Sequence, residues 1–261
     1  GFEVNDMGFG SRSYTFMQFT WFSIRGWDEG KVFREYQINF NQWVDGNSEF
    51  DVYSKGGNIN AHGTFLNNWR TGGGIGLNAS GLSISELRGG PAIYKPSNIN
   101  IWYNIHSDFR KPVSFGAFAS VFHNEDDVES VSFGPEISYR AFDNLQISVE
   151  TEYSKFSDTW AWRGIGLDSN SDKHYIFSDL DQKTLSMEMR ADYTVTTNLS
   201  IQFYGQALFT AGEYTNFRET DQVRAASFNE RFSELENAIT DLDVNGNDGL
   251  DIYNDQSEYY T

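Results

Sequence analysis

The sequence predicts an all-β protein, and specifically an antiparallel transmembrane β-barrel with about ten strands in this chain. Three observations predict this fold. Aromatic residues make up 16% of the 261 residues, segments of about ten residues alternate apolar and polar side chains, and the connections between segments alternate between short and long. The mean hydropathy of -0.53 is polar, which a barrel tolerates because only every second strand residue faces lipid.

The composition excludes several other classes of protein. The 37 acidic residues outnumber the 19 basic ones and give a net charge of -18, so nucleic acid is not an expected partner, because phosphate binding needs clustered Lys and Arg. The absence of cysteine excludes disulfide scaffolds and thiolate metal sites. No apolar run reaches the roughly 18 residues that a transmembrane helix needs, and the aromatic content argues against disorder.

Alternation with a period of two predicts the strands, most clearly in the C-terminal half. From Leu145 to Tyr153 the odd positions are mainly apolar, while the even positions up to Ser154 are polar. The segments 185–195 and 199–209 repeat this pattern on either side of a short turn. In chain order, the expected strands lie near 13–25, 31–44, 58–69, 72–86, 99–105, 113–121, 130–140, 145–154, 185–195 and 199–209.

The lengths of the connections predict the topology. Short connections are expected at 26–30, 70–72, 107–111, 141–144 and 196–198. Longer ones are expected at 45–57, 87–97, 123–129 and 157–182, and a long tail from 211. Outer-membrane barrels have short periplasmic turns at one rim and long extracellular loops at the other. An antiparallel sandwich with one wet face also has alternating strands, but it has no reason to sort its loops in this way.

In a barrel, the polar set of side chains faces the lumen. The expected lumen-lining residues are Glu150, Glu152, Glu188, Arg190 and Asp192. Neighbouring antiparallel strands bring them close enough for a cross-strand ladder of charges and hydrogen bonds. Two interpretations stay open: a polar, weakly cation-favouring pore lining, or lumen charges that pair with one another and plug a narrow barrel.

Several aromatic residues near the expected strand ends are typical of membrane-interface girdles, where an amphipathic ring prefers the headgroup level. They are Trp21, Trp43, Trp69, Trp102, Tyr139 and Tyr153. The same residues would also suit the core of a sandwich.

Residues 211–261 are expected to form a long extracellular loop or tail, separate from the strands of residues 1–210. A short amphipathic helix over about 228–240 is indicated by apolar residues at helical spacing after the potential cap Ser227. An Asp-rich segment follows at 241–251.

This Asp-rich segment is a candidate Ca²⁺ site, because it places oxygen ligands at alternate positions and a glycine at a sharp turn. The candidate ligands are Asp241, Asp243, Asn245, Asn247, Asp248 and Asp251. Ile252 stands where an EF-hand loop has its bidentate Glu, so Asp251 would have to act in a shortened loop. The alternative is a solvated acidic loop with Asn-Gly and Asp-Gly turns. Bound Ca²⁺ would brace an extracellular loop.

An ordered set of short motifs also carries a resemblance. The motifs are Asn5-Asp6-Met7-Gly8-Phe9, Arg88-Gly89-Gly90-Pro91, Asp108-Phe109-Arg110-Lys111-Pro112, Asp181-Gln182-Lys183-Thr184-Leu185-Ser186, Arg190-Ala191-Asp192-Tyr193-Thr194 and Asn198-Leu199-Ser200-Ile201-Gln202. Up to about residue 220, the chain resembles the C-terminal region of the family labelled domain of unknown function 5916, exported proteins mostly of Bacteroidota and other Gram-negative bacteria.

The resemblance implies an outer-membrane β-barrel preceded by a family 9 carbohydrate-binding-like domain, and hence a place in the bacterial outer membrane. It also implies that this chain is part of a larger barrel, since family members usually continue into more strands. It brings no established activity.

The expected function is that of an outer-membrane barrel acting as a pore or as a scaffold subunit of an envelope complex. Its partners would be outer-membrane lipid and other envelope proteins, and the resemblance implies a link to glycan handling or uptake. An enzyme is not expected, because no nucleophile elbow, zinc motif or phosphate-binding loop occurs. The alternative is a soluble, extracellular β-rich module that is stabilised by Ca²⁺ and binds carbohydrate or protein.

Overall fold

The main element of the fold is one antiparallel sheet of eleven strands. The computed structural model describes residues 15–167, 172–235, 237–239, 251–254 and 257–259. The strands of this sheet are β1 (Thr15–Gly26), β2 (Phe33–Asn47), β3 (Val52–Phe65), β4 (Arg70–Ala79), β7 (Asn98–His106), β8 (Val113–Asn124), β9 (Glu129–Phe142), β10 (Leu145–Leu167), β11 (Lys173–Thr196), β12 (Leu199–Thr220) and β13 (Phe232–Glu234). The predicted all-β antiparallel fold is confirmed, and each expected strand is present with shifted ends.

The remaining elements are small. Strands β5 (Gly81–Ser83) and β6 (Ile93–Lys95) form a pair, and β14 (Asn237–Ile239), β15 (Asp251–Asn254) and β16 (Ser257–Tyr259) form a three-stranded sheet. One helical turn, α1, spans Phe228–Arg231. No helix in the described ranges has the length and apolar character needed to cross a bilayer.

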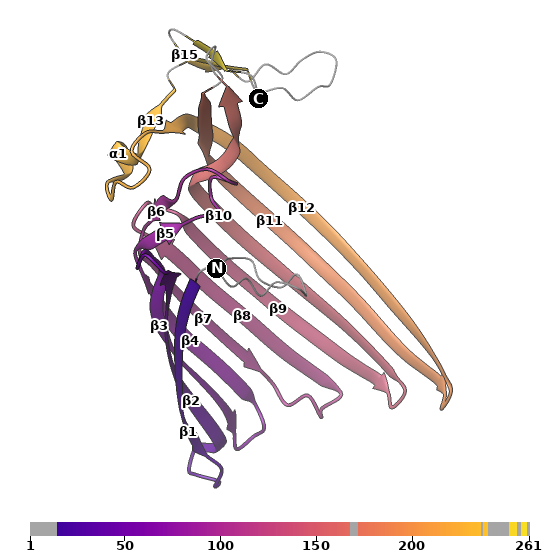
Figure 1. Ribbon diagram of the computed structural model, residues 1–261. Coiled ribbons are helices and arrows are strands. Elements are labelled where there is room, and N and C mark those ends of the chain that lie inside the picture. The colour runs from indigo at the N-terminus through magenta and orange to yellow at the C-terminus, as the bar shows by residue number, and fades with distance from the viewer. Residues whose placement is uncertain (1–14, 168–171, 236, 240–250, 255–256, 260–261) are drawn as a thin grey trace.

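The large strands follow one another in space almost in chain order, so the sheet is a meander that curves like part of a cylinder wall (Figure 1). Each hairpin places consecutive strands side by side, which keeps the pairing local. Within the described ranges, β1 pairs only with β2, and β12 pairs with β11 and β13. The described sheet is therefore open along the edge of β1 and along most of β12.

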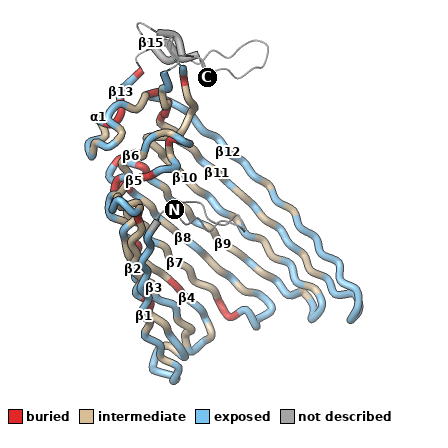
Figure 2. Tube along the Cα trace, in the orientation of Figure 1, coloured by how far each residue is buried: buried red, intermediate tan, exposed pale blue. Residues whose placement is uncertain are grey.

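The two faces of the sheet differ in composition and in exposure. Along β9, Val131, Phe133, Ile137 and Tyr139 are exposed, whereas the residues at even-numbered positions from Ser130 to Ser138 are half-buried. Exposure therefore alternates along the strand, as the alternating colours in Figure 2 show. The apolar face is the more accessible one, which is the reverse of a half-buried sheet in a soluble protein.

The connections predicted to be short all lie at one end of the sheet, at 27–32, 66–69, 107–112, 143–144 and 197–198. This part of the loop prediction is confirmed. Three of the predicted longer connections are wrong. Strands β2 and β3 leave only 48–51 between them, β8 and β9 leave only 125–128, and at the predicted loop 157–182 strand β10 continues to Leu167 and β11 starts at Lys173. Strands β10, β11 and β12 have 23, 24 and 22 residues and project beyond the rest of the sheet (Figure 1).

The boundary expected at residue 210 and the helix expected over 228–240 are also corrected. Strand β12 continues to Thr220, and the helix ends after one turn, at Arg231. Ser227 makes no side-chain capping hydrogen bond, and Phe232 adopts an extended backbone that pairs with Thr220. Pairing with β12 and burial of the Phe232 ring at the end of the sheet therefore outweigh the weak helical propensity of this short segment.

A small hydrophobic core lies where β10–β12 project, and we call it the rim cluster. Its buried members are Leu87, Ile93, Phe177 and Phe232, and the partly buried side chains that pack against them are Trp160, Trp162, Tyr175, Val223 and Phe228. Buried positions gather near β5, β6 and β13 (Figure 2). The rim cluster explains why β10 and β11 stay paired here, since the ring of Trp162 contacts that of Phe177 edge to face, 5.4 Å between centroids.

Candidate functional site

A row of directly paired residues crosses the polar face of the sheet from β2 to β12, and we call it the charged row. Its members, in strand order, are Glu35, Thr64, Arg70, His106, Gly116, Glu136, Glu150, Glu188 and Gln206. The strand registers bring together residues that are far apart in the sequence. In the charged row, basic side chains lie on β4 and β7, and carboxylates lie on β9, β10 and β11.

The predicted lumen-lining residues all lie on this face. Glu150 is paired directly with Glu188, Ser148 with Arg190, and Gln146 with Asp192, while Glu152 is paired with Ser186. Arg190 donates to Glu188 over 3.1 Å, and Tyr204 donates its hydroxyl to the same carboxylate, also over 3.1 Å. The registers therefore put the expected charges on one face.

Three carboxylates stand next to one another in the charged row, on β9, β10 and β11. Glu136, Glu150 and Glu188 line a depression of about 210 Å³ together with Ser138, Gln146 and Ser148. Like charges directly opposite one another destabilise a sheet. A cation in this depression would reduce their mutual repulsion, as Arg190 already does at Glu188.

Gly116 allows His106 and Glu136 to meet across β8. The Nδ1 atom of His106 lies 3.0 Å from Oε1 of Glu136, although the strands of these residues are not neighbours. A Cβ at Gly116 would lie 2.5 Å from each of these two atoms. Only a residue without a side chain leaves room for this contact.

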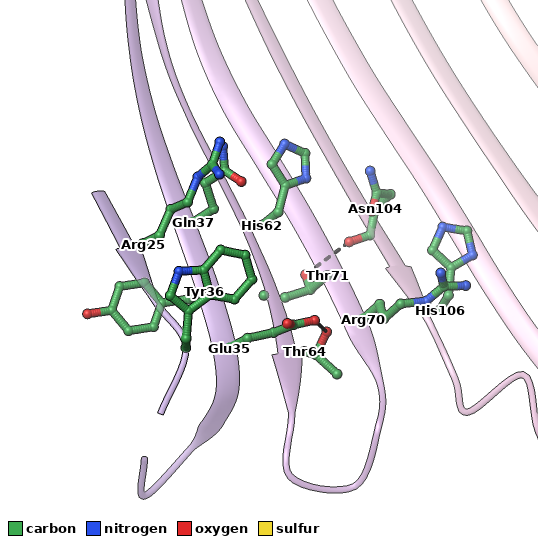
Figure 3. A pocket seen from close by; sticks show the side chains of 12 residues that line it. Arg25, Glu35, Tyr36, Gln37, His62, Thr64, Arg70, Thr71, Asn104 and His106 are labelled. Carbon is green, nitrogen blue, oxygen red and sulfur yellow. Dashed lines mark hydrogen bonds between the residues drawn. The ribbon is translucent and has the colours of Figure 1, made fainter. Parts of the chain in front are cut away.

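A pocket of about 380 Å³ lies on β1–β7 near the short-turn end and contains Arg25, Glu35, His62 and Arg70 (Figure 3). Trp27, Gln37, Thr64, Asn104 and His106 also line it. In the described part of the chain, neither arginine has a carboxylate within ion-pair distance, and each lies against an aromatic ring. Arg25 lies 5.6 Å from the Trp21 ring centroid and Arg70 lies 4.7 Å from that of Phe109.

Two further rows on the polar face contain no ionisable side chain from β1 to β12, and together we call them the uncharged belt. The first row is Ser23, Asn39, Asn60, Gly74, Trp102, Ser120, Ser132, Ser154, Thr184 and Thr210. The second row is Trp21, Asn41, Asn58, Gly76, Asn100, Phe122, Ser130, Phe156, Gln182 and Gly212. The belt thus consists of amides, hydroxyls, glycines and aromatic rings.

The positions of the tryptophans correct the girdle interpretation. Trp21 donates its indole N–H to Asn39 and Trp43 donates its own to Ser54, and Trp102 is paired directly with Ser120. These three rings lie on the polar face, so the interpretation is wrong for them. Tyr139 and Tyr153 lie on the apolar face, about half exposed.

The rim cluster contains a buried ion pair. Arg231 has no exposed surface and contacts Asp126, which is also buried. Burial raises the pKa of the Asp126 carboxyl, and the charge of Arg231 counteracts part of that rise. The acidic stretch 125–129 is therefore more than the solvated loop tip that its composition indicates, because one of its carboxylates anchors the segment after β12.

The candidate Ca²⁺ ligands cannot be placed together. Asp241, Asp243, Asn245, Asn247 and Asp248 lie outside the described residues, and Asp251 is the first residue of β15. Over the ranges that the structure does describe, no group of three or more His, Asp or Glu side chains is arranged to hold a metal ion. The Ca²⁺ site stays a prediction.

The pocket and the uncharged belt are features that reasoning from the sequence missed. One signal for the belt was available in β4, where Gly72, Gly74 and Gly76 recur with a period of two. A Cβ at Gly76 would lie 2.2 Å from Oδ1 of Asn100, and one at Gly74 would lie 2.9 Å from Nε1 of Trp102. Glycines repeated on one face indicate that larger side chains from both neighbouring strands lie over that strand.

Comparisons with known proteins agree with the motifs. A family model described as "Domain of unknown function (DUF5916)" matches residues 1–247. Neither a curated protein nor a solved structure matches the chain.

Proposed function

The chain belongs to the DUF5916 family, and we propose that it forms part of the wall of an outer-membrane β-barrel that acts as a pore or as a scaffold subunit of an envelope complex. In this proposal the apolar face contacts lipid and the polar face lines the lumen. The link to glycan handling or uptake belongs to the same proposal.

The observation that carries the proposal is the exposed apolar face. One of its rows of directly paired residues, from β2 to β12, is Ile38, Ala61, Gly73, Tyr103, Ala119, Phe133, Tyr153, Leu185 and Phe209. Phe133 is 52% exposed and Phe209 is 65% exposed. A continuous apolar surface of this kind is a liability in water but is the normal outer surface of a membrane barrel.

The lengths of the strands support the same proposal. The main strands from β1 to β9 have between 9 and 15 residues, and a strand needs about 9–11 residues to cross the hydrocarbon core. Edge strands cannot stay unpaired in lipid, because each unsatisfied backbone group costs several kcal/mol. We therefore propose that further strands pair with β1 and β12 and complete a larger barrel.

The orientation follows from the asymmetry of the two ends. In this proposal the end without projecting strands, which carries the turns at 143–144 and 197–198, faces the periplasm, because short turns are typical of the periplasmic rim of such barrels. The projecting parts of β10–β12 and the rim cluster then lie outside the cell. The Asp-rich segment 241–251 follows them in the chain and would bind Ca²⁺ on that side.

Membrane extraction tests the proposal. Membranes that contain the full-length protein are washed with carbonate and high salt and are then solubilised in detergent. The protein should stay in the membrane until detergent is added. On a gel it should migrate faster unheated than boiled, because a folded barrel resists SDS at room temperature. Full release by salt or carbonate would contradict the barrel and would favour the soluble, Ca²⁺-stabilised binding module.

The proposed Ca²⁺ site has a separate test. Chelation by EDTA should lower the melting temperature of the full-length protein and expose residues 220–261 to protease, because a cation that binds only the folded state stabilises it. The Asp243→Asn variant should show the same sensitivity without EDTA. If neither quantity changes on chelation, the segment is only a solvated acidic loop.

A further inference from the structure

The uncharged belt is unusual in a chain that is rich in charged residues. Charged residues make up 21% of the chain, and the charged row lies on the same face, nearer to the short-turn end. Yet the belt has none in either of its two rows from β1 to β12. The polar face therefore has two chemically distinct zones, one ionic and one neutral.

The amides of the belt are positioned by contacts with one another. Asn39 donates to Asn60 over 2.8 Å, Asn60 donates to Asn58 over 2.9 Å, and Asn41 donates to Asn58 over 2.7 Å. A side-chain amide has two N–H donors and two acceptor lone pairs. Among the described residues, the amide of Asn41 uses a single donor, so toward these residues it keeps both donor and acceptor capacity while its orientation is fixed.

The far side of the belt presents hydroxyls in a similar network. Thr184 and Thr210 share a hydrogen bond of 2.6 Å, and Gln182 donates to both over 3.2 Å. Amides and hydroxyls both donate and accept hydrogen bonds. They therefore match a ligand whose groups also do both, such as the hydroxyls of a sugar. A small ion would find no opposite charge here to compensate for its loss of hydration.

Aromatic rings complete the chemistry. Trp21 is 51% exposed, and its indole N–H is held by Asn39 at 3.2 Å. Trp102 lies over Gly74, where a Cβ would approach its Nε1 to 2.9 Å. A flat ring beside amides offers an apolar surface for the C–H face of a sugar and hydrogen bonds for its hydroxyls.

We propose that the uncharged belt binds neutral, hydroxyl-rich solutes of the oligosaccharide class and discriminates against charged solutes of the same size. This inference rests on the proposed function, because it requires that the polar face line a water-filled lumen. It deepens that function by naming the class of solute. The charged row then acts on ions, and the belt acts on uncharged solutes.

Tryptophan fluorescence tests the inference directly. Full-length protein in detergent is titrated with maltohexaose, a neutral probe, and with hexagalacturonate, a probe of the same length that carries carboxylates. Maltohexaose should change the emission with saturation, and hexagalacturonate should bind at least about tenfold more weakly, which corresponds to about 1.4 kcal/mol. Equal binding of both probes would overturn the proposed discrimination.

Substitutions within the belt then locate the site. Trp102→Ala should weaken maltohexaose binding about tenfold. Trp102→Phe should lose less affinity, because it keeps an aromatic ring. Trp69→Ala is the matched control, since Trp69 lies in the turn after β3 and outside the belt. Equal affinity in Trp102→Ala and Trp69→Ala would overturn the assignment to the belt.

The outcomes separate the inference from the proposed function. If the protein resists carbonate extraction and shifts on heating but binds no maltohexaose, the barrel stands and the inference fails. If the protein is released without detergent, the barrel and the inference fail together.

Discussion

Arg231 connects the segment after β12 to the turn between β8 and β9. Its guanidinium contacts the carboxylate of Asp126 and donates to the carbonyl oxygens of Ala225 and Ala226. Its charge also lies 5.8 Å from the ring centroid of Trp160. Burying an ion pair costs desolvation energy, so the intact pair adds little net stability. Loss of one partner is strongly destabilising, because the other partner then stays buried as an unpaired charge.

At this scale we predict that Arg231→Met destabilises the rim cluster by about 3–5 kcal/mol, because Asp126 is left as an uncompensated buried charge. Hydrogen exchange in residues 221–235 should accelerate accordingly. Adding Asp126→Asn should restore part of the protection. The control is Arg224→Gln, whose exposed side chain lies 3.7 Å from Asp51 and should contribute about 0–1 kcal/mol. Equal protection in Arg231→Met and wild type would contradict this prediction.

The turn at 107–112 between β7 and β8 is stabilised by its own charges. Arg110 donates to both carboxylate oxygens of Asp108, over 2.9 and 2.7 Å, and its backbone N–H donates to Oδ1 over 3.0 Å. The side-chain hydrogen bonds from Arg110 hold the pKa of Asp108 well below its usual range. Because the folded state prefers the ionised carboxylate, the stabilisation of the folded state by Asp108 is fully present above the unfolded pKa of about 3.9.

For this element we predict an acid-dependent stability. As the pH falls below about 4 towards the lowered pKa of folded Asp108, the unfolding midpoint of the wild type should fall. The unfolding midpoint of Asp108→Asn should be lower than that of the wild type at neutral pH, and it should lack this fall with decreasing pH. Asp143→Asn, in the turn between β9 and β10, is the control and should keep the wild-type slope. The measurement is thermal unfolding in detergent from pH 5 to pH 2, and parallel curves for wild type and Asp108→Asn would contradict the prediction.

At the scale of the whole molecule, the sheet separates three kinds of surface: the exposed apolar face, the charged row and the uncharged belt. Each of these surfaces crosses the molecule from the first strands to β12. None depends on a single loop, so the registers of all the strands have to hold at once. A slip of one residue in any strand would move its polar residues to the apolar face.

The charged row gives a prediction for the molecule as a pore. The double variant Glu150→Gln with Glu188→Gln should lower the cation-to-anion permeability ratio in planar bilayers roughly twofold, because rings of carboxylates attract cations. Glu49→Gln, in the turn between β2 and β3, should leave the ratio unchanged. A conducting double variant with an unchanged ratio would show that these carboxylates do not face the conducting path. Absence of conductance in every variant and in the wild type would favour the scaffold.

The sequence by itself predicted the strands, because alternation is a local property and the clearest segments keep it for nine residues or more. It also placed Glu150, Glu188 and Arg190 on one face, since the side chains at every second position of a strand point to the same face of the sheet. It could not predict that 157–167 and 173–182 are strand, because bulges interrupt their regular alternation. They lie between Asp158 and Ala161 and between Trp162 and Gly164 in β10, and between Phe177 and Asp179 in β11.

What only the tertiary structure decided is how residues from distant strands meet. The order of rows across the sheet depends on the register of each hairpin, and these registers brought Arg70 beside His106, His106 to Glu136, and Asn39 to Asn60. The Trp21, Trp43 and Trp102 side chains lie on the polar face because an aromatic residue fits either face of a strand, and only the neighbouring strands determine which one it occupies. The burial of Asp126 and Arg231 likewise depends on packing between segments 105 positions apart, which no local pattern encodes.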